Sequence, residues 1–128
     1  MKQLLFGLFL ATLFSACKKD EAGDISELPG EWRWTSSSSF GVTTTPQSTG
    51  RTFGFIFNTD STCSRTGNWL TASSGTYTYD AGSLENNFRI LLAADTTTYY
   101  RVSITGNILI LDEHSPTDAP VHYFERVR

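Results

Sequence analysis

The side chains best suited to metal or acid–base chemistry lie close together near the C-terminus. Asp112, Glu113 and His114 are consecutive, and Asp118 and His122 follow shortly after them. A zinc site would need three or four such groups to converge at about 2 Å from the ion. The spacing matches no metal-binding motif, and the residues inside the segment are typical of a polar turn. We therefore interpret the segment as a hairpin loop and expect no metal ion and no other cofactor.

Nucleophilic catalysis finds little support in the sequence. His114 and His122 are the only histidines, and neither stands in a motif with a serine or a cysteine. Cys63 has no neighbouring base, so we interpret it as a small, half-buried apolar side chain rather than a nucleophile. The chain also lacks a glycine-rich loop that could bind phosphate. The sequence thus predicts a protein without enzymatic activity and indicates no catalytic residue.

The N-terminus has the pattern of an export signal. A basic start precedes an apolar run over residues 4–14, two small residues and then Cys17. The run is too short for a membrane span, which takes about 20 apolar residues. Residues 14–17 resemble the lipobox of bacterial lipoproteins, in which the signal is cleaved before a cysteine that then carries lipid. The resemblance implies a signal peptide over residues 1–16 and lipidation of Cys17. The alternative is an ordinary secretory signal with a chance cysteine.

A polar segment connects this cysteine to the rest of the chain. Residues 17–27 contain no apolar run, and two lysines and two acidic residues follow the cysteine directly. This order resembles the signal that sends some lipoproteins of Bacteroidetes-type bacteria to the cell surface, although charged residues are also ordinary in a flexible tether. Two or more acyl chains anchor a protein stably. We therefore expect the membrane to be a partner through Cys17, and an outer-membrane location at the periplasmic face or the cell surface.

Size and charge favour one globular domain. Removing residues 1–16 leaves 112 of the 128 residues, enough for a single core. The formal net charge is −3, and the chain has no lysine from Ile25 onward. A mildly acidic surface without a basic stripe argues against a nucleic-acid partner. We assign residues 28–128 to one domain.

The pattern of this domain is that of an all-β protein. Threonine, tyrosine, phenylalanine, isoleucine and valine are frequent, and no stretch shows sustained helical periodicity. The strand at 62–66 is polar, and we expect it to be short or near an edge. The stretch 36–50, rich in serine, threonine, glycine and proline, is predicted to be a long loop across one mouth of a barrel. Eight strands are predicted, at residues 30–35, 51–57, 62–66, 76–79, 88–93, 98–104, 108–111 and 122–127.

Several of these segments carry a family resemblance. Residues 28–32 resemble the Gly-x-Trp signature that opens lipocalins. The later glycines, a Gly-Thr-Tyr triplet and the segment 123–127 follow in an order similar to small lipocalin-like lipoproteins of Bacteroidetes-type bacteria. The resemblance covers most of the domain and implies an eight-stranded up-and-down antiparallel barrel. It also implies that Arg126, or else Arg128, stacks its guanidinium on the Trp32 indole and closes one end of the barrel.

A group of aromatic side chains could point into such a barrel. They would form either a packed aromatic core or the lining of an apolar pocket, with tyrosine hydroxyls as its polar groups. Trp69 lies in a predicted loop, where exposure would indicate a contact surface and burial would be ordinary. The residues that we predict to line a pocket are Trp34, Phe55, Tyr77, Tyr79, Phe88 and Tyr100.

Two functions are consistent with these observations. The first is a lipid-anchored envelope protein whose non-enzymatic, lipocalin-like barrel binds a small apolar ligand. The second is a solid barrel that acts as an interaction module in a complex of envelope proteins. A cavity larger than about 300 Å³ favours the first function, and a filled interior favours the second.

Overall fold

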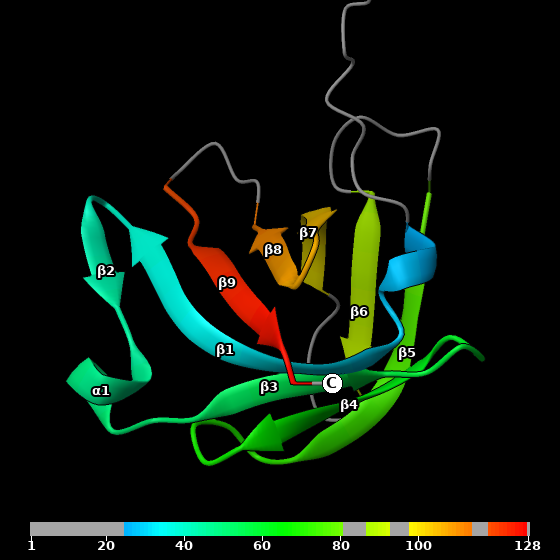
Figure 1. Cartoon of the computed structure of the whole chain (residues 1–128), viewed down its shortest axis with the longest axis horizontal. Helices are drawn as coiled ribbons and strands as arrows, with labels where there is room; N and C mark the ends of the chain where they lie inside the picture. The colour runs from blue at the N-terminus through cyan, green and yellow to red at the C-terminus, as the bar shows by residue number, and fades with distance from the viewer. Residues whose placement is uncertain (1–24, 81–86, 93–97, 114–117, 128) are drawn as a thin grey trace, which may run out of the picture.

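The computed structural model describes residues 25–80, 87–92, 98–113 and 118–127 as an antiparallel β-barrel (Figure 1). Nine strands form a single sheet, and β1 also pairs with β9, so that the sheet closes on itself. Eight strands make the wall of the barrel, and β2 is added at its rim. The strands are β1 (Gly30–Ser39), β2 (Val42–Thr44), β3 (Phe53–Phe57), β4 (Thr62–Gly67), β5 (Ser73–Tyr79), β6 (Phe88–Leu92), β7 (Thr98–Thr105), β8 (Ile108–Asp112) and β9 (Val121–Arg126).

The barrel has the up-and-down order that was expected, and all eight predicted strands are present with small differences at their ends. From β3 to β9, each strand pairs antiparallel with its neighbour in the chain. The closing pair runs from Trp32 opposite Arg126 to Ser38 opposite Val121. Residues 62–66 were predicted to form a strand that is short or near an edge. β4 has six residues and does not lie at an edge, because it sits between β3 and β5 and a closed barrel has no free edge.

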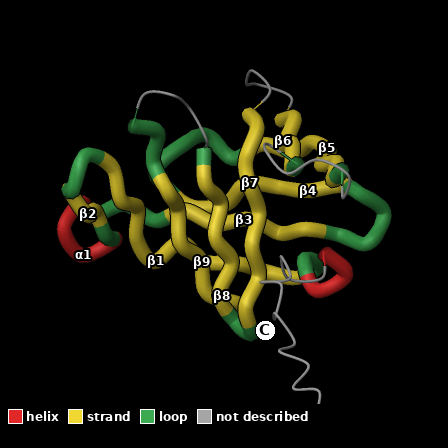
Figure 2. The backbone as a smooth tube through the Cα atoms, turned by 90° about the horizontal axis from the view of Figure 1, so that it is seen from above, coloured by secondary structure: helices red, strands yellow, loops and turns green. Residues whose placement is uncertain are grey.

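The stretch 36–50 is not the long loop that its composition predicted. Its first residues extend β1 to Ser39, a tight turn leads into β2, and α1 (Pro46–Thr49) follows. Phe40 and Gly41 both have positive φ, 50° and 74°, as a two-residue hairpin turn requires. The serines adopt a strand because β1 finds partners on both edges, β2 on one and β9 on the other. Figure 2 shows β2 and α1 together at one side of the barrel. No helix among the described residues is long and apolar enough to cross a membrane.

Large side chains fill the end of the barrel where β1 begins. On most strands of the wall, alternate residues point inward, and at this end they include Trp32, Phe57 and Phe88, all almost fully buried. Leu28, which follows the short helix η1 (Ile25–Glu27), is also fully buried, and the Trp32 Nε1–H donates to its carbonyl at 2.8 Å. This end of the barrel is therefore closed and solid.

Arg126 covers Trp32, as the resemblance implied. The guanidinium carbon of Arg126 lies 4.2 Å from the centre of the indole ring. The same guanidinium donates to the carbonyl of Pro29 at 3.0 Å and to the carbonyl of Glu27. A cation–π contact of this kind contributes about 0.5–2 kcal/mol. Arg128, the other candidate, lies outside the described residues.

Candidate ligand-binding cavity

A cavity of about 530 Å³ occupies the end of the barrel opposite Trp32 and Arg126. Its wall comes from the second half of β1, the first residues of β3, β7 and β9, and the last residues of β6 and β8. Serine and threonine side chains on β1, β2 and β7 face this space, whereas large rings fill the interior at the closed end. Small side chains at these positions leave space inside this end of the barrel.

Aromatic rings make the apolar part of the wall. Phe53 lies between Phe55 and Trp69, with ring centres 5.0 Å and 6.0 Å away, and Phe124 is 5.6 Å from it. Trp69 lies in the connection between β4 and β5, as predicted, but it is half-buried and packs 5.1 Å from the Trp34 ring. Trp69 thus belongs to the wall of the cavity rather than to an outer contact surface.

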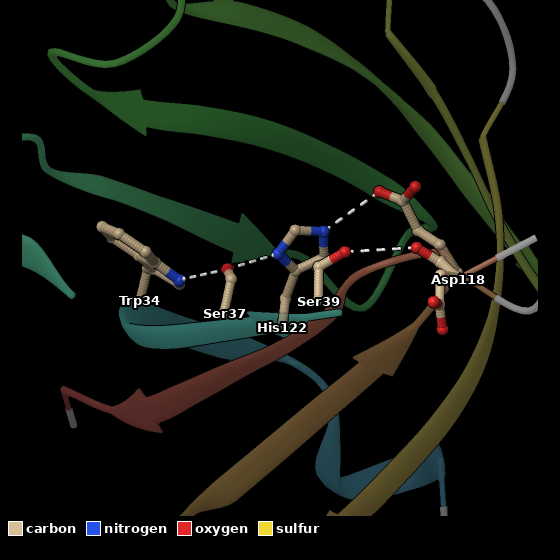
Figure 3. Close-up of polar contacts among 6 residues, drawn as sticks. Trp34, Ser37, Ser39, Asp118 and His122 are labelled. Atoms are coloured by element: carbon tan, nitrogen blue, oxygen red, sulfur yellow. Dashed lines mark hydrogen bonds and ion pairs between the residues drawn. The ribbon is translucent and has the colours of Figure 1, made fainter. Parts of the chain in front are cut away.

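A chain of hydrogen bonds crosses another part of the wall (Figure 3). The Trp34 Nε1–H lies 2.8 Å from Ser37 Oγ, which in turn lies 2.6 Å from His122 Nδ1. His122 Nε2 lies 3.0 Å from Glu113 Oε1. Ser37 faces inward because β1 has a bulge between Trp34 and Ser36, where its register against β9 shifts by one residue. The bulge turns Trp34 and Ser37 to the same side although they are three residues apart.

The two ends of this chain fix the direction of their own hydrogen bonds. An indole N–H can only donate, so Ser37 Oγ accepts from Trp34. A carboxylate can only accept, so His122 donates from Nε2 to Glu113 Oε1. In the tautomer with its single proton on Nε2, His122 accepts at Nδ1 from the Ser37 hydroxyl, and every proton in the chain is then oriented towards Glu113.

The six aromatic residues predicted to line a pocket lie at different heights in the barrel. Phe55 and Tyr100 line the cavity. Trp34 lies behind the lining and contacts it through Ser37 and Trp69. The other three, Tyr77, Tyr79 and Phe88, do not line it.

These three residues belong to the filled end. Phe88 packs against Phe57 and Tyr77, with ring centres 5.8 Å and 5.7 Å away. The Tyr77 hydroxyl donates to the Asn58 carbonyl at 2.6 Å. Burial raises the pKa of Tyr77, and the negative charges of Cys63 and Asp60 raise it by smaller amounts. Tyr79 is half-buried and packs against the core.

The acidic and histidine residues near the C-terminus separate into different environments. His122 and Glu113 meet inside the cavity, whereas Asp112 faces outward with its carboxylate 3.9 Å from the Arg101 guanidinium. Asp118 is exposed, and its carbonyl accepts a hydrogen bond from Ser39. His114 lies outside the described residues. Among the residues that are described, no three His, Cys, Asp or Glu side chains gather in a way that could hold a metal ion.

Cys63 on β4 is expected to react slowly with thiol reagents. It is almost fully buried, and burial raises the pKa of its thiol from 9.0 to about 11. Because the thiolate is the reactive form, this pKa lowers the reactive fraction at pH 8 roughly a hundredfold. The raised pKa also means that burial of the neutral thiol stabilises the fold below pH 9, and that this contribution is lost as the pH rises to about 11.

The measurement is the rate of reaction with DTNB at pH 8. A chain carrying Cys17→Ser keeps Cys63 as its only cysteine. We expect the folded chain to react at least about a hundredfold more slowly than the same chain in guanidinium chloride. Equal rates in the two conditions would contradict the burial of this thiol.

The predicted signal peptide and Cys17 lie outside the described residues, as does most of the tether. The last three residues of the tether, Ile25–Glu27, form η1, and Ile25 packs against the core. Comparison with known proteins finds no match to this chain among family models, curated proteins or solved structures. The cavity and the sequence are therefore the features that point to a function.

Proposed function

We propose that this protein is a lipid-anchored protein of the bacterial cell envelope whose barrel binds a small apolar ligand and does not convert it chemically. The observation that carries the proposal is the cavity of about 530 Å³. Ligand sites in proteins typically have about 300–1,000 Å³, apolar walls and a few polar groups. The rings of Phe53, Phe55 and Trp69 and the short polar chain at Ser37 match that description.

The same cavity favours a binding function over a solid interaction module. A module of that kind needs no interior space, and packed protein interiors contain few voids larger than a water molecule. The hollow end also costs stability, because its lining forgoes contacts that larger side chains would make. A ligand that fills the space would supply the contacts that the lining lacks.

The polar wall of the cavity, formed by Ser37, His122 and Glu113, supports binding rather than hydrolysis. A serine, a histidine and a glutamate in hydrogen-bonded order also occur in hydrolase triads. Here the Trp34 indole donates to Ser37 Oγ and draws on the lone pairs that a nucleophile would use. Ser37 is also only 6% exposed. We therefore propose that these groups orient a ligand and do not attack it.

The proposed location derives from the N-terminal sequence. The lipobox-like segment before Cys17 and the polar residues after it support an anchored domain on a short tether at the outer membrane. The Gly-x-Trp segment, the sequential barrel and the contact between Arg126 and Trp32 support a relationship to small lipocalin-like lipoproteins. Such a protein has the membrane and an apolar ligand as its partners.

The test is the binding of a neutral apolar dye, Nile red, to the chain carrying Cys17→Ser. We expect saturable binding with a rise in fluorescence. Thr98→Trp places a large ring in the cavity, because Thr98 lines it at the start of β7. We expect this change to weaken dye binding at least about tenfold, since it removes the space in which the dye would lie.

Thr105→Trp is the matched control. Thr105 is at the other end of β7, is exposed and does not line the cavity, so the same substitution there should leave dye binding unchanged. Equal circular dichroism spectra would show that both variants fold. The proposal fails if the unsubstituted chain does not bind the dye, or if both tryptophan variants bind it equally well.

A further inference from the structure

We propose that the ligand is an amine with an apolar body. Its protonated amino group donates hydrogen bonds, and the Glu113 carboxylate holds this group inside the cavity. This inference rests on the proposed binding function and specifies the class of ligand. It is supported by the hydrogen-bond capacity left on the polar wall, by the charge on that wall and by the position of the aromatic rings.

The polar wall has committed its protons and kept its lone pairs. In the tautomer of His122 that has its proton on Nε2, Ser37 donates to Nδ1 and His122 donates to the Glu113 carboxylate. Next to them, the Ser39 hydroxyl donates to the carbonyl of Asp118 at 3.1 Å, a bond drawn in Figure 3. These groups can still accept hydrogen bonds from a molecule in the cavity, through the oxygens of Ser37, Ser39 and Glu113. A ligand group that donates hydrogen bonds is therefore the complementary one.

The charge on this wall selects among donors. Glu113 lines the cavity, and its side chain is one-third exposed, so a ligand can reach it. A carboxylate accepts up to about four hydrogen bonds, and the bond from His122 uses one of these positions. A charge-assisted hydrogen bond from an ammonium group is about twice as strong as a neutral one. An anionic head would meet the like charge of Glu113 here.

The lining also contains a cation, Arg65, which lies on the side of the barrel opposite Glu113. In the strand order β4 stands opposite β8, four strands away in either direction. The Arg65 guanidinium donates through Nε and Nη2 to the Thr71 carbonyl, at 3.3 Å and 2.9 Å. The cavity therefore has a negative pole at β8 and a positive pole at β4, and a single amine binds best at the first.

The aromatic rings provide the place for the body of the ligand. Phe53, Phe55 and Phe124 form a contiguous group, with ring centres 5.0–5.8 Å apart, and all three line the cavity. Phe124 is two residues from His122 on β9, so the apolar group borders the polar wall directly. A ligand with an amine at one end and a hydrocarbon body meets both surfaces at once.

The test compares three ligands with the same nine-carbon chain and different heads: nonylamine, nonanol and nonanoate. Each is titrated against Nile red bound to the chain carrying Cys17→Ser at pH 7, where the amine is protonated and the acid ionised. We expect nonylamine to displace the dye at a concentration at least about tenfold lower than nonanoate, with nonanol between them.

Glu113→Gln identifies the residue responsible. Glutamine has the same shape and keeps an oxygen that can accept from His122, so the wall stays intact. We expect this variant to lose about tenfold in its affinity for nonylamine relative to its affinity for nonanol, which has the same chain and no charge. Asp118→Asn is the control, because it removes the same charge from an exposed carboxylate nearby and should change nothing.

The outcomes separate the two proposals. Failure of Nile red to bind removes the proposed function, and the ligand class with it. Dye binding with nonanoate equal to or tighter than nonylamine overturns the amine head alone and indicates Arg65 as the anchor. Equal losses in Glu113→Gln and Asp118→Asn would also overturn it, because the preference would then come from net charge and not from a site.

Discussion

Replacing Trp32 with alanine should lower the free energy of unfolding by about 3–5 kcal/mol, the usual cost of removing a large buried aromatic side chain. Trp32 is fully buried at the closed end. The large side chains around it cannot collapse fully into the space that its removal would leave. The change also removes the bond from Nε1 to the Leu28 carbonyl and the surface on which Arg126 stacks. The η1 segment before β1 would then lose one of its links to the barrel.

Urea denaturation followed by circular dichroism measures this loss. Trp32→Phe keeps an aromatic ring but has no N–H, so we expect a smaller loss that separates packing from the hydrogen bond. Tyr99→Ala is the control, because Tyr99 is half exposed on the outside of β7, and its loss should stay within about 0.5 kcal/mol. A loss below about 1.5 kcal/mol for Trp32→Ala would contradict the packing described for the closed end.

Gly75→Ala is expected to destabilise the barrel by about 3 kcal/mol or more, beyond the usual cost of overpacking. A Cβ atom at Gly75 would overlap the carbonyl oxygen of Leu91 on β6 and lie 2.8 Å from Leu92 Cα. Gly75 pairs with Cys63 on one side and with Leu92 on the other, so neither neighbouring strand can move away without breaking its ladder. The methyl group therefore forces β5 and β6 apart.

Gly106→Ala provides the contrast. Gly106 has a φ of 58° in the turn between β7 and β8, and a Cβ atom there meets nothing within 4 Å. Its substitution costs only the strain of a left-handed backbone, about 1–2 kcal/mol. Urea midpoints of the two variants rank the effects. If Gly75→Ala were no worse than Gly106→Ala, the close approach of β5 to β6 would be disproved.

Strand positions could be predicted because the aromatic residues alternate. Phe53, Phe55 and Phe57 mark one face of β3 without ambiguity, since only a period of two places all three on one side. The sequential barrel was expected from the resemblance to lipocalin-like lipoproteins and not from this alternation. Alternation distinguishes inside from outside, however, and carries no information on height along the barrel axis. Tyr77 and Phe88 were predicted to line a pocket; both are buried inside the barrel, but they lie at its filled end and do not line the cavity.

The polar wall could not be found from the sequence. It joins Ser37 to His122 across 85 residues, and neither residue belongs to a local motif. The four serines at 36–39 have no alternation of polarity, so nothing in them indicates that β1 continues or that it contains a bulge. Their extended conformation comes from pairing with β2 and β9, which is a tertiary effect that overrides composition.

The bulge in β1 has a consequence for how this protein tolerates change. A bulge that moves by one residue along a strand exchanges the residues that face inward and outward. In most strands such a move would replace one chemistry by another. Here residues 36–39 are all serine, so whichever of them faces His122, a hydroxyl meets the imidazole. The sequence is degenerate next to the bulge, and the cavity wall is therefore protected against small errors in strand alignment.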